Sequence, residues 1–190
     1  MPKETYIPQL FQLFQQYGYD GATLSKIAAA TGLGKASLYH HFPGGKDDMV
    51  QSVLTYAEAW LTENVLQPLA RPGNAQERLR QMCDRINELY SGGTQPCLLA
   101  ILQAGTGREL FHSQVKALIE RWIAAIATVL TEAGLDKATA RQRGEESLVA
   151  IQGGLMLSQA LDNVVPFQRV LQALPEKACR PALVSQQKIA

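Results

Sequence analysis

Apolar residues recur at helical spacing along most of the chain, and no stretch shows the two-residue alternation of a β-strand. The clearest pattern lies in residues 108–133, where apolar side chains keep the spacing i, i+3, i+4 and i+7. The sequence is therefore predicted to be all-α, with about nine helices. Apolar residues also predict helices over residues 4–17, 46–67, 75–90, 137–162 and 166–174, and a short, strongly apolar helix over 97–104. A polar, partly ordered tail is predicted over 176–190.

Two short helices joined by a tight turn are predicted between residues 23 and 42. Thr23 is placed to cap the first of them, because its hydroxyl can accept from the free N–H groups of the first turn. Gly32 ends that helix, since glycine adopts a left-handed backbone at little cost. Gly34 or Thr31 then caps the second helix, which is apolar on its inner side and rich in hydrogen-bond donors outside. A helix of this kind suits the major groove of DNA.

The helix predicted over residues 4–17 precedes this pair and completes a three-helix DNA-binding domain, which we place at residues 1–46. Pro8 is compatible with that helix because it falls in the first turn, where its missing N–H has no partner to lose. Residues 47–190 are predicted to form a second domain for ligand binding and dimerisation. Within it, residues 148–161 are apolar on nearly every side, so this segment must be covered by more than one neighbour.

The composition indicates a folded protein, with 46% hydrophobic and 18% charged residues. Three cysteines at scattered positions form no disulfide framework and favour a reducing compartment. We find neither a secretory signal nor a membrane-spanning stretch, and we predict a cytoplasmic protein. Cys97 and His112 have no third residue at a suggestive spacing, and the usual phosphate-loop and metal motifs are missing from the sequence. We therefore predict no enzyme activity, no cofactor and no metal site.

The charge balance bears on any DNA partner. The net charge of the chain is +1, and the first 48 residues carry four lysines and four acids, a net charge of zero. The groups are Lys3, Lys26, Lys35 and Lys46 against Glu4, Asp20, Asp47 and Asp48. Few cations release few counterions, so we expect DNA affinity to depend weakly on salt and to rely on a second copy of the domain.

A distinctive order and spacing of residues runs through the first 46 positions: Leu13-Phe14, Gly18-Tyr19, Thr23, Ile27-Ala28, Gly32-Leu33, Leu38-Tyr39, His41-Phe42 and Lys46. This pattern closely resembles the N-terminal domain of the tetracycline-repressor (TetR) family of transcriptional regulators. A branch of that family includes lincomycin-resistance operon repressors. Three further segments are similar to this branch, namely Pro43-Gly44-Gly45-Lys46, Cys97-Leu98-Leu99-Ala100 and Ile151-Gln152-Gly153-Gly154-Leu155.

The resemblance implies a repressor that binds a palindromic operator in double-stranded DNA as a homodimer. It also implies that the last two long helices form a four-helix dimer interface, and that a pocket in the core binds a small effector. Binding of the effector would alter the spacing of the two DNA-reading domains and release the DNA.

The resemblance also assigns the DNA contacts. Lys35, Ala36 and Ser37 would lie in the major groove, and the hydroxyl of Tyr39 would reach a phosphate. The alternative for these positions is an ordinary solvated helix start beside a partly buried ring. The complete set of predicted DNA-binding residues is Thr23, Lys26, Gly34, Lys35, Ala36, Ser37, Tyr39, His40, His41 and Lys46.

Three of these residues raise separate questions. His40 and His41 point about 100° apart on a helix, so they do not share a metal ion, and one of them is expected to face the DNA. Lys46 stands at the start of a helix, where the helix dipole disfavours a cation. A phosphate bound at that helix start would explain the lysine.

A set of apolar and amide residues in the second domain is a candidate lining for the effector pocket. For any single member, packing in the core is the simpler interpretation, because Met and aromatic residues at helical spacing are usually core residues. Taken together, they favour an apolar or aromatic effector. The set is Trp60, Met82, Ile86, Asn87, Gln103, Phe111, Leu118, Trp122, Gln152 and Met156.

Two other functions compete with a regulator. One is a helical small-molecule-binding protein with an incidental helix-turn-helix, which would need a polar constellation in the core that the sequence lacks. The other is a partner-binding module whose neutral head has weak or lost DNA binding, and the balanced charge is compatible with it.

Overall fold

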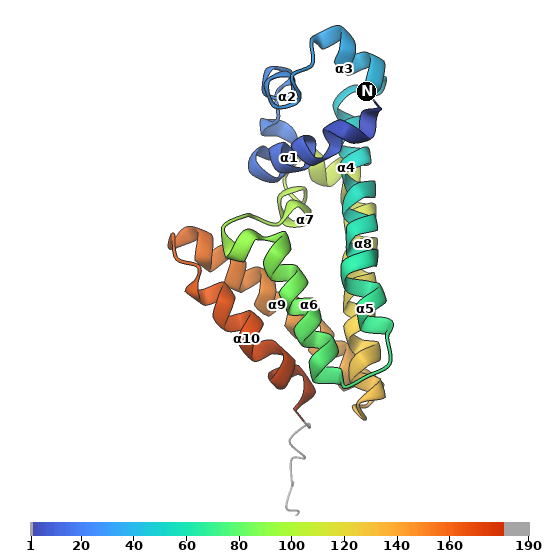
Figure 1. The fold of residues 1–190 in the computed structure, drawn as a ribbon, viewed down its shortest axis with the longest axis vertical. Coiled ribbons are helices and arrows are strands. Elements are labelled where there is room, and N and C mark those ends of the chain that lie inside the picture. The colour runs from blue at the N-terminus through green and yellow to red at the C-terminus, as the bar shows by residue number, and fades with distance from the viewer. Residues whose placement is uncertain (1, 181–190) are drawn as a thin grey trace, which may run out of the picture.

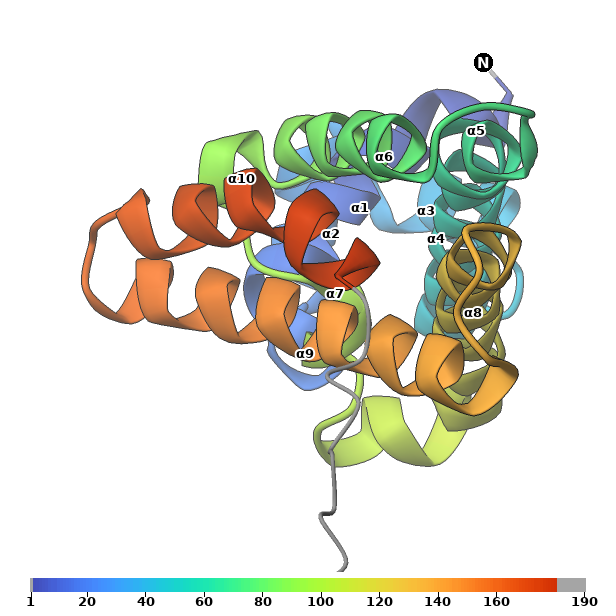
Figure 2. The same ribbon diagram turned by 90° about the horizontal axis from the view of Figure 1, so that it is seen from below.

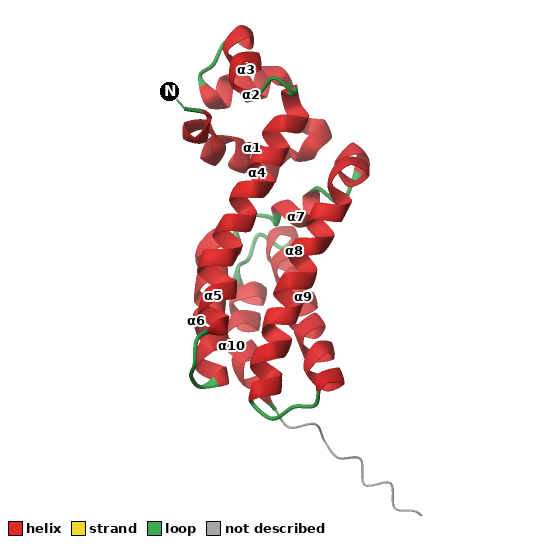
Figure 3. Cartoon of the chain, turned by 90° about the vertical axis from the view of Figure 1, so that its right-hand side faces the viewer, coloured by secondary structure: helices red, strands yellow, loops and turns green. Residues whose placement is uncertain are grey.

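The computed structural model describes residues 2–180, and that range is helical with no β-strand (Figure 3). It contains ten α-helices, two of which, α4 and α5, are joined by a π-helical turn, so nine separate helices result within the described range. The all-α prediction is thereby confirmed. The bounds are α1 (Ile7–Gly21), α2 (Leu24–Thr31), α3 (Lys35–His41), α4 (Gly45–Leu61), α5 (Gln67–Ala70), α6 (Ala75–Leu89), α7 (Leu98–Ile101), α8 (Gly105–Glu132), α9 (Lys137–Ala160) and α10 (Val165–Cys179).

Helices α1, α2 and α3 form a small head at one end of the molecule, and α4 runs from this head into the larger core (Figure 1). The predicted capping of the head is present. The Thr23 hydroxyl accepts from the N–H of Lys26 at 3.3 Å, and Gly32 ends α2 with a left-handed φ of 71°. Gly34, rather than Thr31, is the N-cap of α3. These local signals fix the turn between the two short helices.

Helix α1 starts three residues later than predicted, after a 3₁₀ turn over Lys3–Tyr6. Pro8 lies in its first turn, as expected. At Gly18 the backbone leaves the helical region, with φ 64° and ψ −172°, and one more turn follows to Gly21. The regular part of α1 therefore ends at the glycine that was predicted to end it.

The prediction that the long helix ends before Pro68 is wrong. The helix continues through a π-helical turn over Thr62–Leu66 and then through α5, which carries Pro68 in its first turn. The wider π turn shifts the hydrogen-bonding register, so that the N–H of Gln67 bonds to the carbonyl of Thr62. The proline at the next position then needs no N–H partner and the chain stays helical.

Two other boundaries also differ from prediction. Helix α8 begins at Gly105 rather than at Arg108, because a side chain from the head caps its first turn, as described below. Helix α10 continues beyond Leu174 through Pro175 to Cys179, with both Leu174 and Pro175 buried. Residues 176–179 are therefore helical rather than part of a tail, and the remaining residues of the predicted tail, 181–190, lie outside the described residues.

One contiguous apolar cluster extends from the inner faces of α1, α2 and α3 in the head into the larger core between α4, α6, α8, α9 and α10. Helix α9 packs between α8 and α10, and α10 also packs on α6 (Figure 2). The apolar second half of α9 is buried on one side, at Leu148, Ile151 and Leu155, but remains open on the other. No helix within residues 2–180 is long and apolar enough to cross a membrane.

Candidate DNA-reading surface and core cavity

Helix α3 has one buried side and one exposed side. Leu38 is 1% exposed and packs into the head, whereas Lys35, Ala36, Ser37, Tyr39 and His40 are exposed. An α-helix with its side chains is about 10–12 Å across, which fits a major groove about 12 Å wide. The outer face of α3 is therefore a suitable shape and chemistry for reading base edges.

Two of the predicted DNA-binding lysines make contacts within the head. The Lys26 amine donates to the carbonyl of Gly21 at 3.1 Å and lies 3.7 Å from the centre of the Tyr17 ring. The Lys46 amine lies 4.1 Å from the centre of the Tyr19 ring. Cation–π contacts of this kind hold a lysine at the start of α4 without a phosphate. Lys46 is thus explained without DNA, and its phosphate contact stays a prediction.

Lys35 is different from these two lysines. It is the first residue of α3, it is exposed, and it forms neither an ion pair nor a cation–π contact with residues 2–180. Its amine is therefore available for an external partner. Ala36 and Ser37 follow directly on the same exposed turn.

The remaining predicted head residues surround this turn. Tyr39 is 43% exposed, and its ring edge lies 3.5 Å from the position of a Cβ added to Gly45, at the start of α4. His41 is half-buried against the ring of Tyr6, with ring centres 5.3 Å apart, while His40 is exposed. Of the two histidines, His40 is therefore the one that faces outward.

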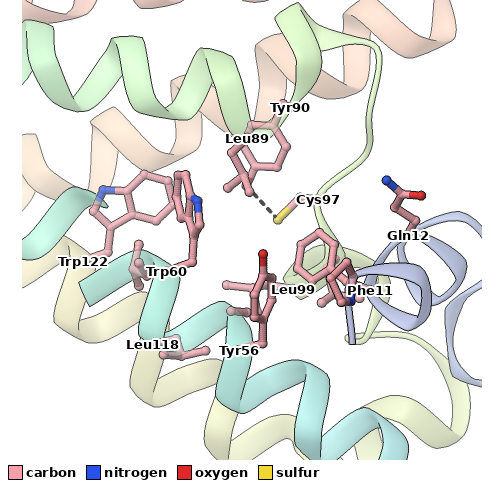
Figure 4. Close-up of a pocket in the computed structure, with 14 residues that line it drawn as sticks. Phe11, Gln12, Tyr56, Trp60, Leu89, Tyr90, Cys97, Leu99, Leu118 and Trp122 are labelled. Atoms are coloured by element: carbon pink, nitrogen blue, oxygen red, sulfur yellow. Dashed lines mark hydrogen bonds between the residues drawn. The ribbon is translucent and has the colours of Figure 1, made fainter. Parts of the chain in front are cut away.

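A cavity of about 170 Å³ lies where the head meets the core (Figure 4). Trp60 and Trp122 stand at one end of it, and Phe11 and Leu99 at the other. Its wall is almost entirely apolar and contains no charged side chain. The lining residues are Pro8, Phe11, Gln12, Tyr56, Ala57, Trp60, Leu61, Leu89, Tyr90, Cys97, Leu98, Leu99, Leu118 and Trp122. Such a wall suits an uncharged, apolar occupant.

Buried hydrogen bonds fix parts of this wall. The indole N–H of Trp122 donates to the Met82 sulfur at 3.3 Å, and the Tyr90 hydroxyl donates to the Cys97 sulfur at 3.2 Å. Burial raises the pKa of the Tyr90 hydroxyl well above its ordinary value, so this group stays a donor. The polar groups that line the cavity more openly are the Gln12 amide and the Tyr56 hydroxyl.

Three of the ten predicted ligand-binding residues, Trp60, Leu118 and Trp122, line the cavity. Met82 lies directly behind Trp122, and Ile86 is fully buried in the core. Gln152 is half-buried on α9. The other four lie elsewhere. Asn87 accepts a hydrogen bond from Gln168 of α10, and Gln103 accepts one from Arg108 on the surface. Phe111 packs on Tyr19 at the junction with the head. Met156 is 60% exposed on the outer side of α9.

The sequence-based set missed the cavity residues contributed by the head and by the exposed side of α4. Phe11 belongs to the apolar face of α1, which periodicity assigns to the head's own core, and Gln12 lies beside it. Tyr56 is 42% exposed and follows no apolar stripe. Only the packing of α1 on α4 and α7 brings these side chains to the cavity, so local sequence signals could not identify them.

The head is attached to the core by a second group of contacts at the far end of α1. The buried Gln15 amide donates to the carbonyl of Pro96 at 2.6 Å. The Asp20 carboxylate accepts from the N–H of Thr106, in the first turn of α8, at 3.1 Å. The Tyr19 hydroxyl donates to Asp47, and burial together with this hydrogen bond raises the pKa of Tyr19 to about 12. The end of α1 is thus fixed to the start of α8.

An exposed apolar stripe follows α9. Its members are spaced by multiples of a helical turn and continue into the connection to α10. The exposed residues are Val149 (71%), Met156 (60%), Leu157 (47%), Leu161 (62%), Val164 (38%) and Val165 (49%). Gly153 lies on the same side, with nothing within 4 Å of the position of an added Cβ. An apolar surface this continuous is typical of a protein–protein interface.

Within residues 2–180, no group of three or more His, Cys, Asp or Glu side chains could hold a metal ion. Together, the exposed reading helix, the long helix leading to an apolar cavity and the apolar stripe define a helical regulator of the helix-turn-helix class.

Comparison with known proteins places the chain within that class. The sequence profile of the bacterial regulatory proteins of the tetR family matches residues 10–53, and that of the LmrA/YxaF-like transcriptional regulator C-terminal domain matches residues 73–173, more than half of the chain. The chain therefore belongs to the TetR family of transcriptional regulators, in the branch with an LmrA/YxaF-like C-terminal domain. Because this is a family of regulators, the predictions of family and of a non-enzyme are confirmed.

Relatives span nearly the whole chain. It is 24% identical over 182 residues to the HTH-type transcriptional regulator LmrA of Bacillus subtilis, covering 92% of this chain and 95% of that protein. The head alone is 45% identical over 51 residues to the negative transcriptional regulator IcaR of the icaADBC biofilm operon of Staphylococcus aureus, 27% of each chain. A TetR regulator structure from Legionella pneumophila has the same fold, with a TM-score of 0.80, 22% identity, and coverage of 92% and 96%.

Proposed function

We propose that this protein is a cytoplasmic repressor that binds a palindromic DNA operator as a homodimer and releases it when an uncharged apolar or aromatic effector occupies the core cavity. The observation that carries the proposal is the exposed turn of α3 in a TetR-family head, with Lys35, Ala36 and Ser37 facing outward. The repressor role is supported by IcaR, a negative regulator whose head is similar.

The DNA contacts would be divided between bases and backbone. Lys35 and Ser37 would donate to base edges, and Ala36 would contact a thymine methyl. Tyr39, Thr23 and His40 would contact phosphates beside the groove, which position the helix without reading sequence. Lys26 and Lys46 would first have to leave the Tyr17 and Tyr19 rings, so their contribution would be smaller than that of Lys35.

The dimer would form through α9 and α10, as the exposed stripe on α9 indicates. Val149, Met156 and Leu161 together expose an apolar surface that a monomer would leave in water. Gly153 would permit close approach of a second copy of α9, because it adds no side chain to that surface. A symmetric dimer through this face would present two heads to the two halves of a palindrome.

The effector would enter the cavity between Trp60, Trp122 and Phe11. The wall carries no charge and few polar groups, so it favours a compound with an aromatic body and one polar group that can reach Gln12 or Tyr56.

Footprinting of the purified protein on the DNA upstream of its own gene tests the proposal. The expected result is a protected site with two-fold symmetry, saturable at a concentration at which unrelated DNA is not protected. A uniform, weak protection of all sequences would favour the alternative of a partner-binding module that has lost specific DNA binding.

A further inference from the structure

We propose that the core cavity is a wedge site: an occupant larger than one aromatic ring displaces Phe11 of α1, and this displacement tilts the head and releases the DNA. The inference rests on the proposed function, since it concerns how an effector in the same cavity acts. It names the moving wall, the fixed point and the size of compound that is needed.

The first observation is that the DNA-binding head supplies part of the cavity wall. Pro8, Phe11 and Gln12, all on α1, line the cavity together with residues of α4, α6, α7 and α8. An occupant would therefore touch the head directly. Its effect on DNA binding would need no relay through the rest of the core.

The second observation is the size of the cavity. Its volume of about 170 Å³ is close to that of an engineered cavity of about 150 Å³ that holds benzene. Pockets for larger ligands have volumes of about 300–1,000 Å³. The cavity as it stands therefore accommodates one aromatic ring, and a compound with two rings that is held entirely inside it must move part of the wall.

The third observation identifies the part that moves. Trp122 is 2% exposed and Leu118 is 4% exposed, and both are packed within the core, where close-packed surroundings resist displacement. Phe11 is half-buried and meets the 42% exposed Tyr56 edge to face, with ring centres 5.8 Å apart. Phe11 is less buried than Trp122 and Leu118, so we infer that it is displaced first.

The fourth observation is a fixed point further along the same helix. Gln15 bonds to Pro96 of the core, and Asp20 bonds to Thr106 at the start of α8. Gln15 lies about one helical turn beyond Phe11, and Asp20 lies past the break in α1 at Gly18. A push at Phe11 against this fixed end rotates α1, and α2 and α3 move with it because α2 packs on α1.

The two tryptophans of the chain, Trp60 and Trp122, both line the cavity, so their fluorescence reports occupancy directly. Phenol serves as a one-ring probe, and 2-naphthol and 4-phenylphenol as two-ring probes. All three probes are expected to quench the tryptophan fluorescence of the wild-type protein. Only the two-ring probes are expected to weaken binding to the footprinted DNA, by about tenfold or more. Equal release of DNA by phenol would overturn the proposal.

The decisive variant is Phe11→Ala, with Leu110→Ala as the control, because Leu110 is a partly exposed apolar residue of α8 that does not line the cavity. In Phe11→Ala the two-ring probes are expected to quench the tryptophans as in the wild type, while their effect on DNA affinity falls below about twofold. Leu110→Ala is expected to keep the full effect. If Phe11→Ala does not bind DNA without a probe, Phe11→Leu replaces it, with an intermediate effect expected.

The outcomes separate the wedge from the proposed function. If the two-ring probes quench the tryptophan fluorescence of Phe11→Ala and still release its DNA fully, the wedge proposal is overturned. The assignment of the cavity as the effector site would then still hold. Absence of quenching by every probe in the wild-type protein would overturn the cavity assignment, and with it both the effector role and the wedge.

Discussion

The carboxylate of Asp20, in the head, accepts a hydrogen bond at 3.1 Å from the backbone N–H of Thr106 and so caps the first turn of α8 in the core. The N-cap residue of α8, Ala104, has no side chain that could do this. The capping group therefore comes from a position 86 residues away in the chain. The same hydrogen bond both starts the longest helix and holds the head to the core.

Replacement of Asp20 is expected to destabilise the protein through this cap. Asp20→Ala should lower the free energy of unfolding by about 1 kcal/mol, the usual cost of losing an N-cap. Asp20→Asn keeps an acceptor oxygen and should retain most of that stability. Urea unfolding followed by tryptophan fluorescence measures both. Equal stability of the alanine variant and the wild type would show that the contact contributes nothing.

A charge in the apolar stripe of α9 is expected to disrupt the dimer. Met156→Arg places a cation on a surface that the proposed interface would bury, and should weaken dimerisation by about 2 kcal/mol or more, the scale of an interface hot spot. Sedimentation velocity measures the change. Leu110→Arg is the matched control, because Leu110 is also exposed (46%) but lies on α8, away from the stripe. If both variants remain dimers, the interface lies elsewhere.

The cysteines are expected to differ in reactivity. Burial raises the pKa of Cys83 to about 12, so at pH 8 very little of this thiol is the reactive thiolate. Cys179 is half-buried, and its pKa is raised less strongly. Iodoacetamide at pH 8 should therefore label Cys179 well before Cys83, as judged by mass spectrometry of the native protein. Labelling of Cys83 before Cys179 would show that the packing around α6 opens readily.

The raised pKa of Cys83 also predicts a dependence of stability on pH. A thiol whose pKa is higher in the folded than in the unfolded state stabilises the fold below the unfolded value of 9.0, and this stability is lost as the pH rises toward about 12. Cys83→Ala should reduce the loss of stability between pH 9 and 11. If Cys83→Ala loses as much stability between pH 9 and 11 as the wild type, other groups cause that loss.

For a dimeric regulator, this protein is expected to have a DNA affinity that depends only weakly on salt concentration. Two of the few lysines in the head, Lys26 and Lys46, are already held over tyrosine rings, so few cations remain to displace counterions. The slope of log K against log salt concentration should be clearly shallower than about −8. A slope of about −8 to −10 would mean that additional cations reach the DNA.

The head was largely predictable from sequence because short-range signals determine it. The Thr23 cap, the left-handed Gly32 and the inward-facing Leu38 each act within a few residues. The same holds for the number of helices and for most of their positions. Membership of the TetR family followed from the spacing of these signals.

Long-range packing explains most of what the sequence did not predict. Gly105 and Gly107 lie in the first turn of α8, where they allow close approach of the head. A Cβ at Gly105 would lie 2.3 Å from the Asp20 carboxylate, and one at Gly107 would lie 3.2 Å from Tyr19. The cavity residues of α1 and the position of Lys46 over Tyr19 likewise depend on contacts between elements.

A comparison of two variants tests the claim that the exposed turn of α3 reads DNA. Lys35→Ala and Lys116→Ala remove the same charge, but Lys116 is on α8 in the core, where it pairs with Glu120. Fluorescence anisotropy on the footprinted DNA should show at least about tenfold weaker binding for Lys35→Ala and near wild-type binding for Lys116→Ala. Equal affinities of the two variants would contradict the claim.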